Sequence, residues 1–193
     1  MNKTNLNIEL KDGRNLGYAE YGNENGKPII YCHGSQSSRL EMHYDTSFAI
    51  KNNLRIITID RPGHGISDFN PEGSILSFAD DVIQLVEHLK IGKFSVVGMS
   101  AGSPFALGLA YSFPEKIEAV NIISGFAPFD SSSKQFLSKE IKTMLNLAKS
   151  FPFLLKIMLK IQAKQLKKNP QKALIGFLKI MDESDQIVLK DEK

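Results

Sequence analysis

The sequence predicts an α/β protein in which helices flank a mostly parallel sheet, followed by a purely helical segment. Three observations support this fold class. Short apolar runs rich in β-branched residues are typical of strands buried in a parallel sheet. Helical patterns alternate with these runs as far as residue 130, an order that favours a layered α/β sheet. Beyond residue 130 the strand patterns end and helical patterns continue.

The first predicted element is an antiparallel hairpin. Residues 5–10 and 15–21 alternate between apolar and polar side chains on either side of the turn signal Lys11-Asp12-Gly13-Arg14. Short apolar runs follow, each bounded by Gly, Pro or Asp. We interpret them as buried parallel strands over residues 28–32, 55–59, 94–97 and 117–123.

The clearest helix is predicted to begin at Ser77-Phe-Ala-Asp80, whose spacing is that of a capping box. Apolar residues then recur with the spacing of one helix face, at positions 82, 85, 86 and 89, and Gly92 ends the pattern. We expect Asp81, Gln84 and His88 on the polar, solvent-facing side of this helix.

Composition and charge indicate two structural parts. The 193 residues are 42% apolar and 23% charged, as in an ordinary globular protein. Residues 1–130 carry 11 Lys and Arg against 15 Asp and Glu, a net charge of −4, whereas residues 131–193 carry 13 Lys against 6 acids, a net charge of +7. Together with the polar stretch 130–134, this shift predicts a core domain over 1–130 and a helical part over 131–193.

Several classes of protein are disfavoured. Cys32 is the only cysteine, and the first ten residues lack the apolar stretch of a secretory signal, so we expect a cytoplasmic protein. Lysines interrupt even the most apolar stretch, residues 151–161, so no transmembrane helix is predicted. A net charge of +3 does not indicate a nucleic-acid partner. No metal or nucleotide motif occurs, so we expect neither metal nor cofactor; no oligomeric state is predicted.

A candidate nucleophile lies in the pattern G-x-S-x-G, formed by Gly98, Ser100 and Gly102. A predicted strand leads into it, and a predicted helix over 101–113 leads out, the setting in which such a serine is exposed on a strained turn. Glycines leave room for neighbouring backbone there. The amide of Ala101, at the helix N-terminus, could stabilise an oxyanion. The alternative is that Ser100 merely caps the helix.

Two further loops follow predicted strands. His33-Gly34-Ser35 comes directly after the strand 28–32, and the backbone amide of Ser35 is our candidate for the second oxyanion donor. We interpret His33 as an anchor of this loop, with a role as catalytic base as the alternative. The segment 60–68, which contains His64, follows the strand 55–59, and we interpret it as a loop that forms one wall of the site, with His64 as a catalytic base as the alternative.

With these three segments in order, the chain resembles the α/β-hydrolase family: an HG loop after the third strand, D-x-P-G-x-G-x-S after the fourth, and the nucleophile elbow after the fifth. The resemblance implies an esterase-like serine hydrolase that cleaves an ester, thioester, amide or related acyl bond of a small molecule. Ser100 would carry the acyl group, and the amides of Ser35 and Ala101 would form the oxyanion hole. Residues that shape the elbow and loop would be His33, Gly34, Gly98 and Gly102. Gln36 and Ser37 stand where many relatives have Pro or Pro-Gly.

The catalytic acid and base of this family follow the serine along the chain, in the order Ser, acid, His. All four histidines, at 33, 43, 64 and 88, precede Ser100. We therefore expect a truncated chain that lacks the last two strands of the core, with impaired catalysis. Asp130 is considered as an orienting acid, and His43 and His88 as surface residues. The alternative hypothesis is a non-catalytic ligand-binding protein of the same fold.

By the same resemblance, residues 131–193 correspond to an incomplete helical cap or lid. Residues 154, 157, 158 and 161 form one apolar face, while lysines at 156, 160, 164 and 168 follow another. We interpret residues 150–168 as a lid over an acyl pocket. A helix lying on a membrane surface is the alternative.

Overall fold

The computed structural model describes residues 2–35, 37–42, 46–125, 135, 137 and 139–178. The chain divides into two compact units, Met1–Ala127 and Pro128–Lys193. His43 and Asp130, considered above as a surface residue and an orienting acid, lie outside the described residues.

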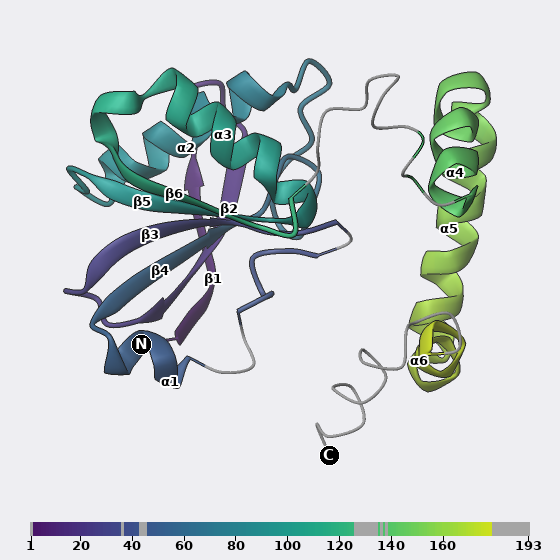
Figure 1. Ribbon diagram of the computed structural model, residues 1–193, viewed down its shortest axis with the longest axis horizontal. Coiled ribbons are helices and arrows are strands. Elements are labelled where there is room, and N and C mark those ends of the chain that lie inside the picture. Colours follow the sequence, from purple (N-terminus) through teal and green to yellow (C-terminus); the bar gives the residue numbers. More distant parts are fainter. Residues whose placement is uncertain are drawn as a thin grey trace. The chain divides into compact units, whose positions relative to one another are not determined.

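The first unit is built on a six-stranded sheet with the order β1-β2-β4-β3-β5-β6 (Figure 1). The predicted hairpin is formed by β1 and β2, which pair antiparallel, and β2 pairs antiparallel with β4. The remaining pairs, β4 with β3, β3 with β5 and β5 with β6, are parallel. The strand bounds are β1 Asn2–Glu9, β2 Asn15–Gly22, β3 Lys27–Cys32, β4 Leu54–Ile59, β5 Phe94–Met99 and β6 Ile117–Ile123.

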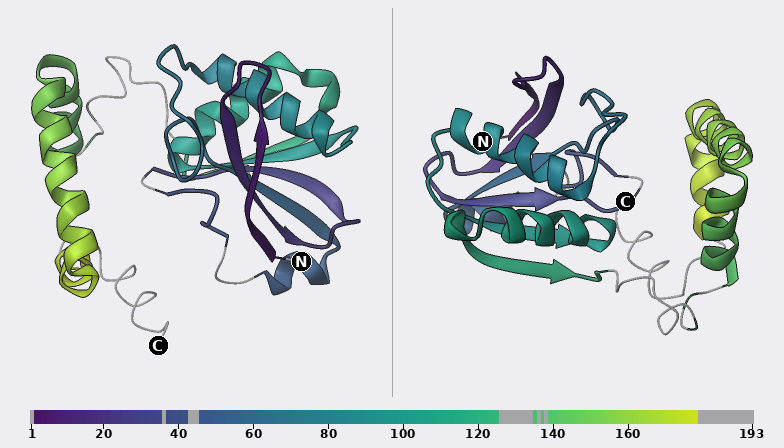
Figure 2. Two further views of the ribbon diagram at one scale, coloured as in Figure 1. Left: turned by 180° about the vertical axis from the view of Figure 1, so that it is seen from behind. Right: turned by 90° about the horizontal axis from the view of Figure 1, so that it is seen from above.

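Helices cover both faces of this sheet. The helices α2 (Ile75–His88) and α3 (Ser103–Ser112) lie side by side over one face (Figure 2), where the larger core gathers around Phe78, Val82 and Leu109. A smaller cluster on the other face packs around Ala49, which belongs to the short helix α1 (Ser47–Lys51). The mostly parallel, helix-flanked sheet confirms the predicted fold class.

Helix α2 begins earlier than predicted. Its N-cap is Ser74, whose hydroxyl accepts a hydrogen bond from the Ser77 amide at 3.0 Å, while the Ser77 hydroxyl accepts one from the Ser74 amide at 2.8 Å. Ser77 is therefore the third residue of the first turn and not the cap. The prediction was wrong because a serine replaced the glutamate or glutamine that usually closes a capping box.

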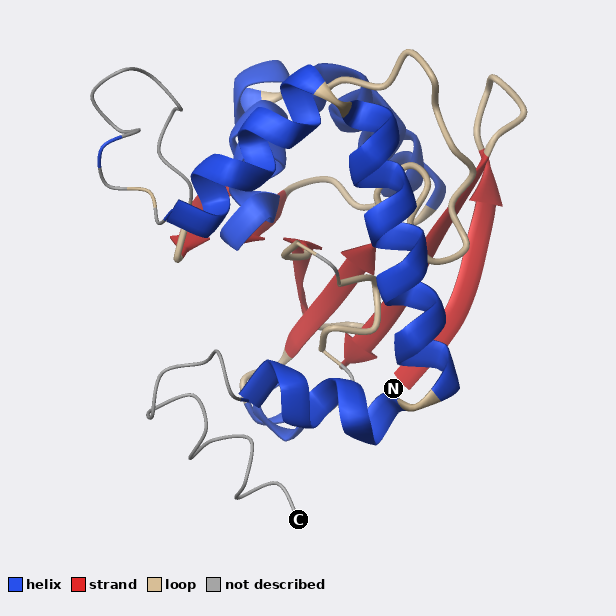
Figure 3. Cartoon of the chain, turned by 90° about the vertical axis from the view of Figure 1, so that its right-hand side faces the viewer, coloured by secondary structure: helices blue, strands red, loops and turns tan. Residues whose placement is uncertain are grey.

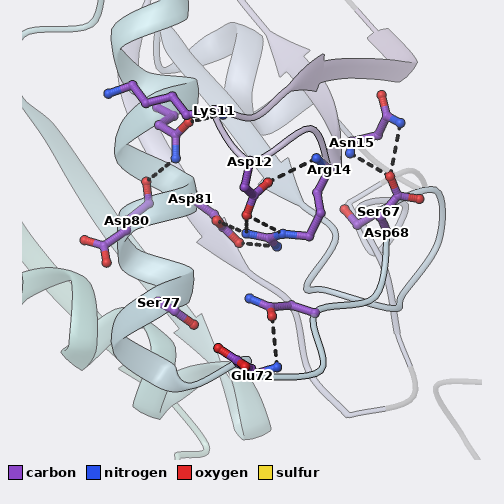
Figure 4. Close-up of polar contacts among 12 residues, drawn as sticks. Lys11, Asp12, Arg14, Asn15, Ser67, Asp68, Glu72, Ser77, Asp80 and Asp81 are labelled. Atoms are coloured by element: carbon purple, nitrogen blue, oxygen red, sulfur yellow. Dashed lines mark hydrogen bonds and ion pairs between the residues drawn. The ribbon is translucent and has the colours of Figure 1, made fainter.

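The expected polar face of α2 is partly wrong. His88 is exposed, but Asp81 is buried, with 2% of its surface accessible. Its carboxylate accepts two hydrogen bonds from the Arg14 guanidinium, at 2.9 and 2.6 Å, and Arg14 also binds Asp12 (Figure 4). This charge-assisted pair attaches the β1–β2 turn to α2. Helix periodicity could not show it because the partner lies 67 residues away along the chain.

Strand β6 is another correction, because it was predicted to be buried. None of its residues is fully buried, and Ile122 and Ile123 are 41% and 47% exposed. In the described sheet β6 is an edge strand, paired only with β5. The apolar run predicted the strand correctly, but it does not indicate where in the sheet the strand lies.

The second unit contains α4 (Lys139–Ser150), α5 (Pro152–Lys168) and α6 (Pro170–Leu178) (Figure 3). Pro152 and Pro170 each begin a helix, because a proline in the first turn lacks only an amide that would have no helical partner. Helix α4 packs against α5, and α5 against α6. No described helix has both the length and the apolar character that crossing a membrane requires.

Candidate active site

Ser100 stands at the sharp turn between β5 and α3. The strand ends at Met99, a 3₁₀ turn spans Ser100–Gly102, and α3 begins at Ser103. The φ angle of Ser100 is +48°, in the left-handed region that costs a non-glycine residue about 1–2 kcal/mol. The Ser103 hydroxyl donates a hydrogen bond to the Ser100 carbonyl oxygen at 2.6 Å. The turn thus holds a half-buried serine in a strained conformation, as is common where function requires a fixed side chain.

The two glycines of the motif are required by close approach of other backbone. A Cβ atom on Gly98 would lie 2.8 Å from the Cβ of Ala106 and 2.9 Å from the Cα of Ser103. On Gly102 it would overlap the Cys32 carbonyl group at the end of β3. Larger residues would therefore push the turn away from α3 and from β3.

The loop after β3 lies directly against this turn. A Cβ atom placed on Gly34 would be 3.7 Å from the Cβ of Ser100. The structure thus brings His33, Gly34 and Ser35 beside Gly98, Ser100, Ala101 and Gly102, at the carboxyl ends of the neighbouring strands β3 and β5. Ser35 is exposed, and Ser100 and Ala101 are half-buried, so the turn is accessible from outside.

Arg61 fixes the orientation of two successive peptide groups in this loop. Its guanidinium donates through Nη1 to the His33 carbonyl oxygen and through Nη2 to the Gly34 carbonyl oxygen, the latter at 3.0 Å. In a trans peptide the N–H points opposite to the C=O. The Gly34 amide accordingly points away from Arg61 and donates to the Glu41 carboxylate at 2.9 Å. By the same geometry the Ser35 amide points away from the Arg61 guanidinium.

His33 is fully buried, and both of its ring nitrogens contact backbone groups. Nδ1 lies 2.9 Å from the Gly34 carbonyl oxygen and Nε2 lies 3.4 Å from the Arg61 amide. These partners require a proton on Nδ1 and a free electron pair on Nε2. The pKa of His33 is lowered to about 4, mainly by burial and to a smaller extent by the positive charge of Arg61. The geometry is that of a loop anchor, with no ring nitrogen left to accept a proton from Ser100.

Glu41 and Tyr31 form a polar pair next to the same loop. The Gly34 amide donates to Oε2 of Glu41, and Oε1 would be 3.3 Å from a Cβ atom on Gly34. Burial raises the pKa of the Tyr31 hydroxyl, and the negative charge of Glu41 raises it further. Sequence reasoning missed Glu41 because its loop carries no recognisable motif.

The segment 60–68 is held by a buried carboxylate. Asp60 accepts hydrogen bonds from the Arg39 amide at 2.7 Å, from Nη1 of Arg39 at 2.8 Å and from the Ile66 amide at 2.9 Å. Ser67 joins the same segment to β2, because its hydroxyl accepts from the Gly17 amide at 2.8 Å. Asp60, Arg39 and Ser67 therefore hold the segment 60–68 in place. These contacts agree with the interpretation of the segment as a structural loop.

A cavity of about 370 Å³ lies beside this wall. Arg61, Pro62 and His64 line it from the segment 60–68, and Phe105 lines it from α3. The His64 and His33 rings are 5.2 Å apart between centroids, and the Arg61 guanidinium stacks 5.1 Å above the Phe105 ring. Within the described ranges, no three His, Cys, Asp or Glu side chains gather closely enough to hold a metal ion.

Comparison with known proteins places this geometry in a family. Residues 27–158 match the family model described as alpha/beta hydrolase fold. The chain belongs to the α/β-hydrolase fold family. The matched span contains all three loops of the site, and the predicted family resemblance is confirmed.

Individual relatives of this chain carry the names of hydrolases. A serine hydrolase-like protein of Danio rerio is 31% identical over 113 residues, which are 56% of this chain and 34% of the relative. The uncharacterized hydrolase YcgS of Bacillus subtilis is 30% identical over 113 residues, 58% of this chain and 39% of the relative. An esterase of Exiguobacterium antarcticum has a TM-score of 0.62 at 20% identity, covering 77% of this chain and 57% of that structure, and shows the fold alone.

The α/β-hydrolase relatives are longer than the matched part of this chain. The two sequence relatives above are covered over 34% and 39% of their length.

Proposed function

We propose that the chain is a serine hydrolase of the α/β-hydrolase type, in which Ser100 attacks an ester, thioester, amide or related acyl bond of a small molecule. The observation that carries this proposal is the positive φ of Ser100 at the strand-to-helix turn. A helix-capping serine needs no such strain, because an N-cap has an ordinary extended backbone. Here the helix α3 begins only at Ser103, three residues later.

The oxyanion that forms on the substrate would be bound by the amides of Ser35 and Ala101. Ala101 lies in the first turn after Ser100, where amides lack helical partners. Arg61 and His33 both hydrogen-bond to the Gly34 carbonyl oxygen, which fixes the direction of the Ser35 amide on the same peptide group. We assign Arg61 and His33 as positioning residues. A fixed donor costs no reorganisation when charge develops.

The step that limits this chain is removal of the Ser100 proton. His33 has both ring nitrogens engaged, and the sequence has no histidine after Ser100. The hydroxyl is a weak nucleophile without a base. We therefore propose that the 193 residues acylate slowly, at a rate set by the oxyanion donors alone, and that an added base accelerates the step.

A fluorophosphonate probe with mass-spectrometric mapping tests this proposal. Ser100 is expected to be the modified residue, Ser100→Ala to abolish the modification, and imidazole to raise the rate by supplying a base. Ser124→Ala is the matched control, because Ser124 has the same φ of +48° but lies beyond β6. Labelling that survives Ser100→Ala would contradict the proposal. Absence of labelling even with imidazole would favour a ligand-binding protein without catalysis.

A further inference from the structure

The second unit carries an unusual concentration of positive charge. Its described helical segment, residues 139–178, contains nine lysines against a single acid, Glu140, whereas residues 1–130 have a net charge of −4. All of the positive charge comes from lysine, since the last arginine of the chain is Arg61. Like charges at this density repel one another, which opposes a compact state unless an anionic surface lies near.

The same unit exposes large apolar side chains in a continuous stripe. On α5 the stripe consists of residues at i, i+3, i+4 and i+7, which share one face of a helix. Their exposed fractions are 48% for Leu154, 39% for Ile157, 45% for Met158 and 53% for Ile161. At the start of the helix, Phe151 and Phe153 are 63% and 75% exposed.

The groove between α4 and α5 lies on another side of α5. A groove of about 470 Å³ lies on α4 and α5, lined by Ala148 of α4 and by Leu155, Leu159 and Ala163 of α5. At 100° per residue, Leu155 and Leu159 lie about 110° and about 150° around the helix from the centre of the stripe. None of the four stripe residues lines this groove, and each keeps at least 39% of its surface accessible.

Lysines border the stripe along one side. Lys164 and Lys168 follow Ile157 and Ile161 at neighbouring angular positions on the helix. Lys160 and Lys156 lie progressively farther around the helix, where they line the groove between α4 and α5. Such side chains can lay their methylene groups along an apolar surface while the ammonium group reaches outward to phosphate or carboxylate.

We propose that the second unit binds the surface of an anionic bilayer, with α5 parallel to the membrane plane. The exposed aliphatic and Phe side chains would contact the acyl chains of the bilayer. The lysines that flank them would bind the anionic headgroups. A nucleic acid would match the lysines but leave the apolar stripe exposed. A lid over an acyl pocket would match the stripe but gives no reason for nine lysines. The inference does not depend on the proposed catalysis.

Co-sedimentation of the full chain with vesicles tests it. We expect little binding to phosphatidylcholine vesicles and strong binding when about a third of the lipid is phosphatidylserine, with binding lost as salt rises. Replacing Lys160, Lys164 and Lys168 with Gln is expected to lower partitioning about fivefold per lysine. Ile157→Ser with Ile161→Ser is expected to weaken binding to the same anionic vesicles.

The matched control replaces exposed lysines of the first unit, Lys51, Lys90 and Lys93, with Gln. This variant has the same net charge as the first lysine variant and is expected to bind vesicles almost as the original chain does. Equal loss in the two lysine variants would overturn the proposal, because net charge alone would then explain binding. Binding that is independent of phosphatidylserine, sedimentation without vesicles, or no binding at all would also overturn it. Circular dichroism checks that the variants remain helical.

Discussion

The strain at Ser100 predicts that this residue is held for a purpose other than stability. Replacing it with Gly removes a left-handed penalty of about 1–2 kcal/mol, because glycine adopts positive φ freely. Glycine also makes the unfolded chain more flexible, which costs about 0.4–1 kcal/mol. We therefore expect Ser100→Gly to be more stable than Ser100→Ala by about 0.5–1 kcal/mol, although neither can react with an acyl group.

Urea unfolding of the two variants, followed by circular dichroism, measures this difference. Ser124 provides the internal comparison, since its φ is also +48° and it is exposed. Ser124→Gly is expected to gain stability over Ser124→Ala by a similar amount, with probe labelling unchanged. If Ser100→Ala were as stable as Ser100→Gly while the pair at 124 differed, the strained turn at Ser100 would be refuted.

Three further predictions concern the surrounding loops. Asp60→Ala should cost about 3–5 kcal/mol in the free energy of unfolding, because it leaves the buried Arg39 guanidinium without its carboxylate. The pKa of His33 is about 4 in the folded protein, below its value in the unfolded chain. Its contribution to the free energy of unfolding is therefore fully present above about pH 6.5. As the pH falls to about 4, about 3 kcal/mol is lost, and His33→Gln should flatten this part of the stability profile. Gly102→Ala should destabilise by about 1–3 kcal/mol or more, because its Cβ would overlap the Cys32 carbonyl.

Each of these has a control. For the pH profile it is His88→Gln, since His88 is an exposed histidine on α2. Asp60→Ala is compared with Asp80→Ala on the exposed side of α2, where a loss below about 0.5 kcal/mol is expected. Gly92→Ala is the control for Gly102→Ala, because a Cβ atom on Gly92 would have no neighbour within 4 Å. Equal effects in variant and control would contradict the corresponding contact.

Much of the fold could be predicted because its signals are local. Apolar runs with β-branched residues predicted the strands, and the turn signal at Lys11–Arg14 predicted the antiparallel hairpin. What failed depends on distant partners. The burial of Asp81 depends on Arg14, and the exposure of β6 depends on its place at the edge of the sheet. Neither is encoded in the periodicity of the segment itself.

The candidate site shows the same division. The motif predicted the strand, turn and helix around Ser100, because small residues and a strained turn leave a sequence pattern. It could not predict that Arg61 would donate to two successive carbonyl groups, since that contact joins the loops after β3 and β4. Glu41 was missed for the same reason, because only the fold brings its carboxylate to the Gly34 amide.

In the proposed site the Ser100 hydroxyl faces amide donors from two separate loops. A crystal structure of the chain phosphonylated at Ser100 would locate these donors, because the phosphoryl oxygen takes the place of the oxyanion. We expect this oxygen to lie about 2.7–3.1 Å from the amide nitrogens of both Ser35 and Ala101. A phosphoryl oxygen directed to solvent, or bound by neither amide, would contradict it.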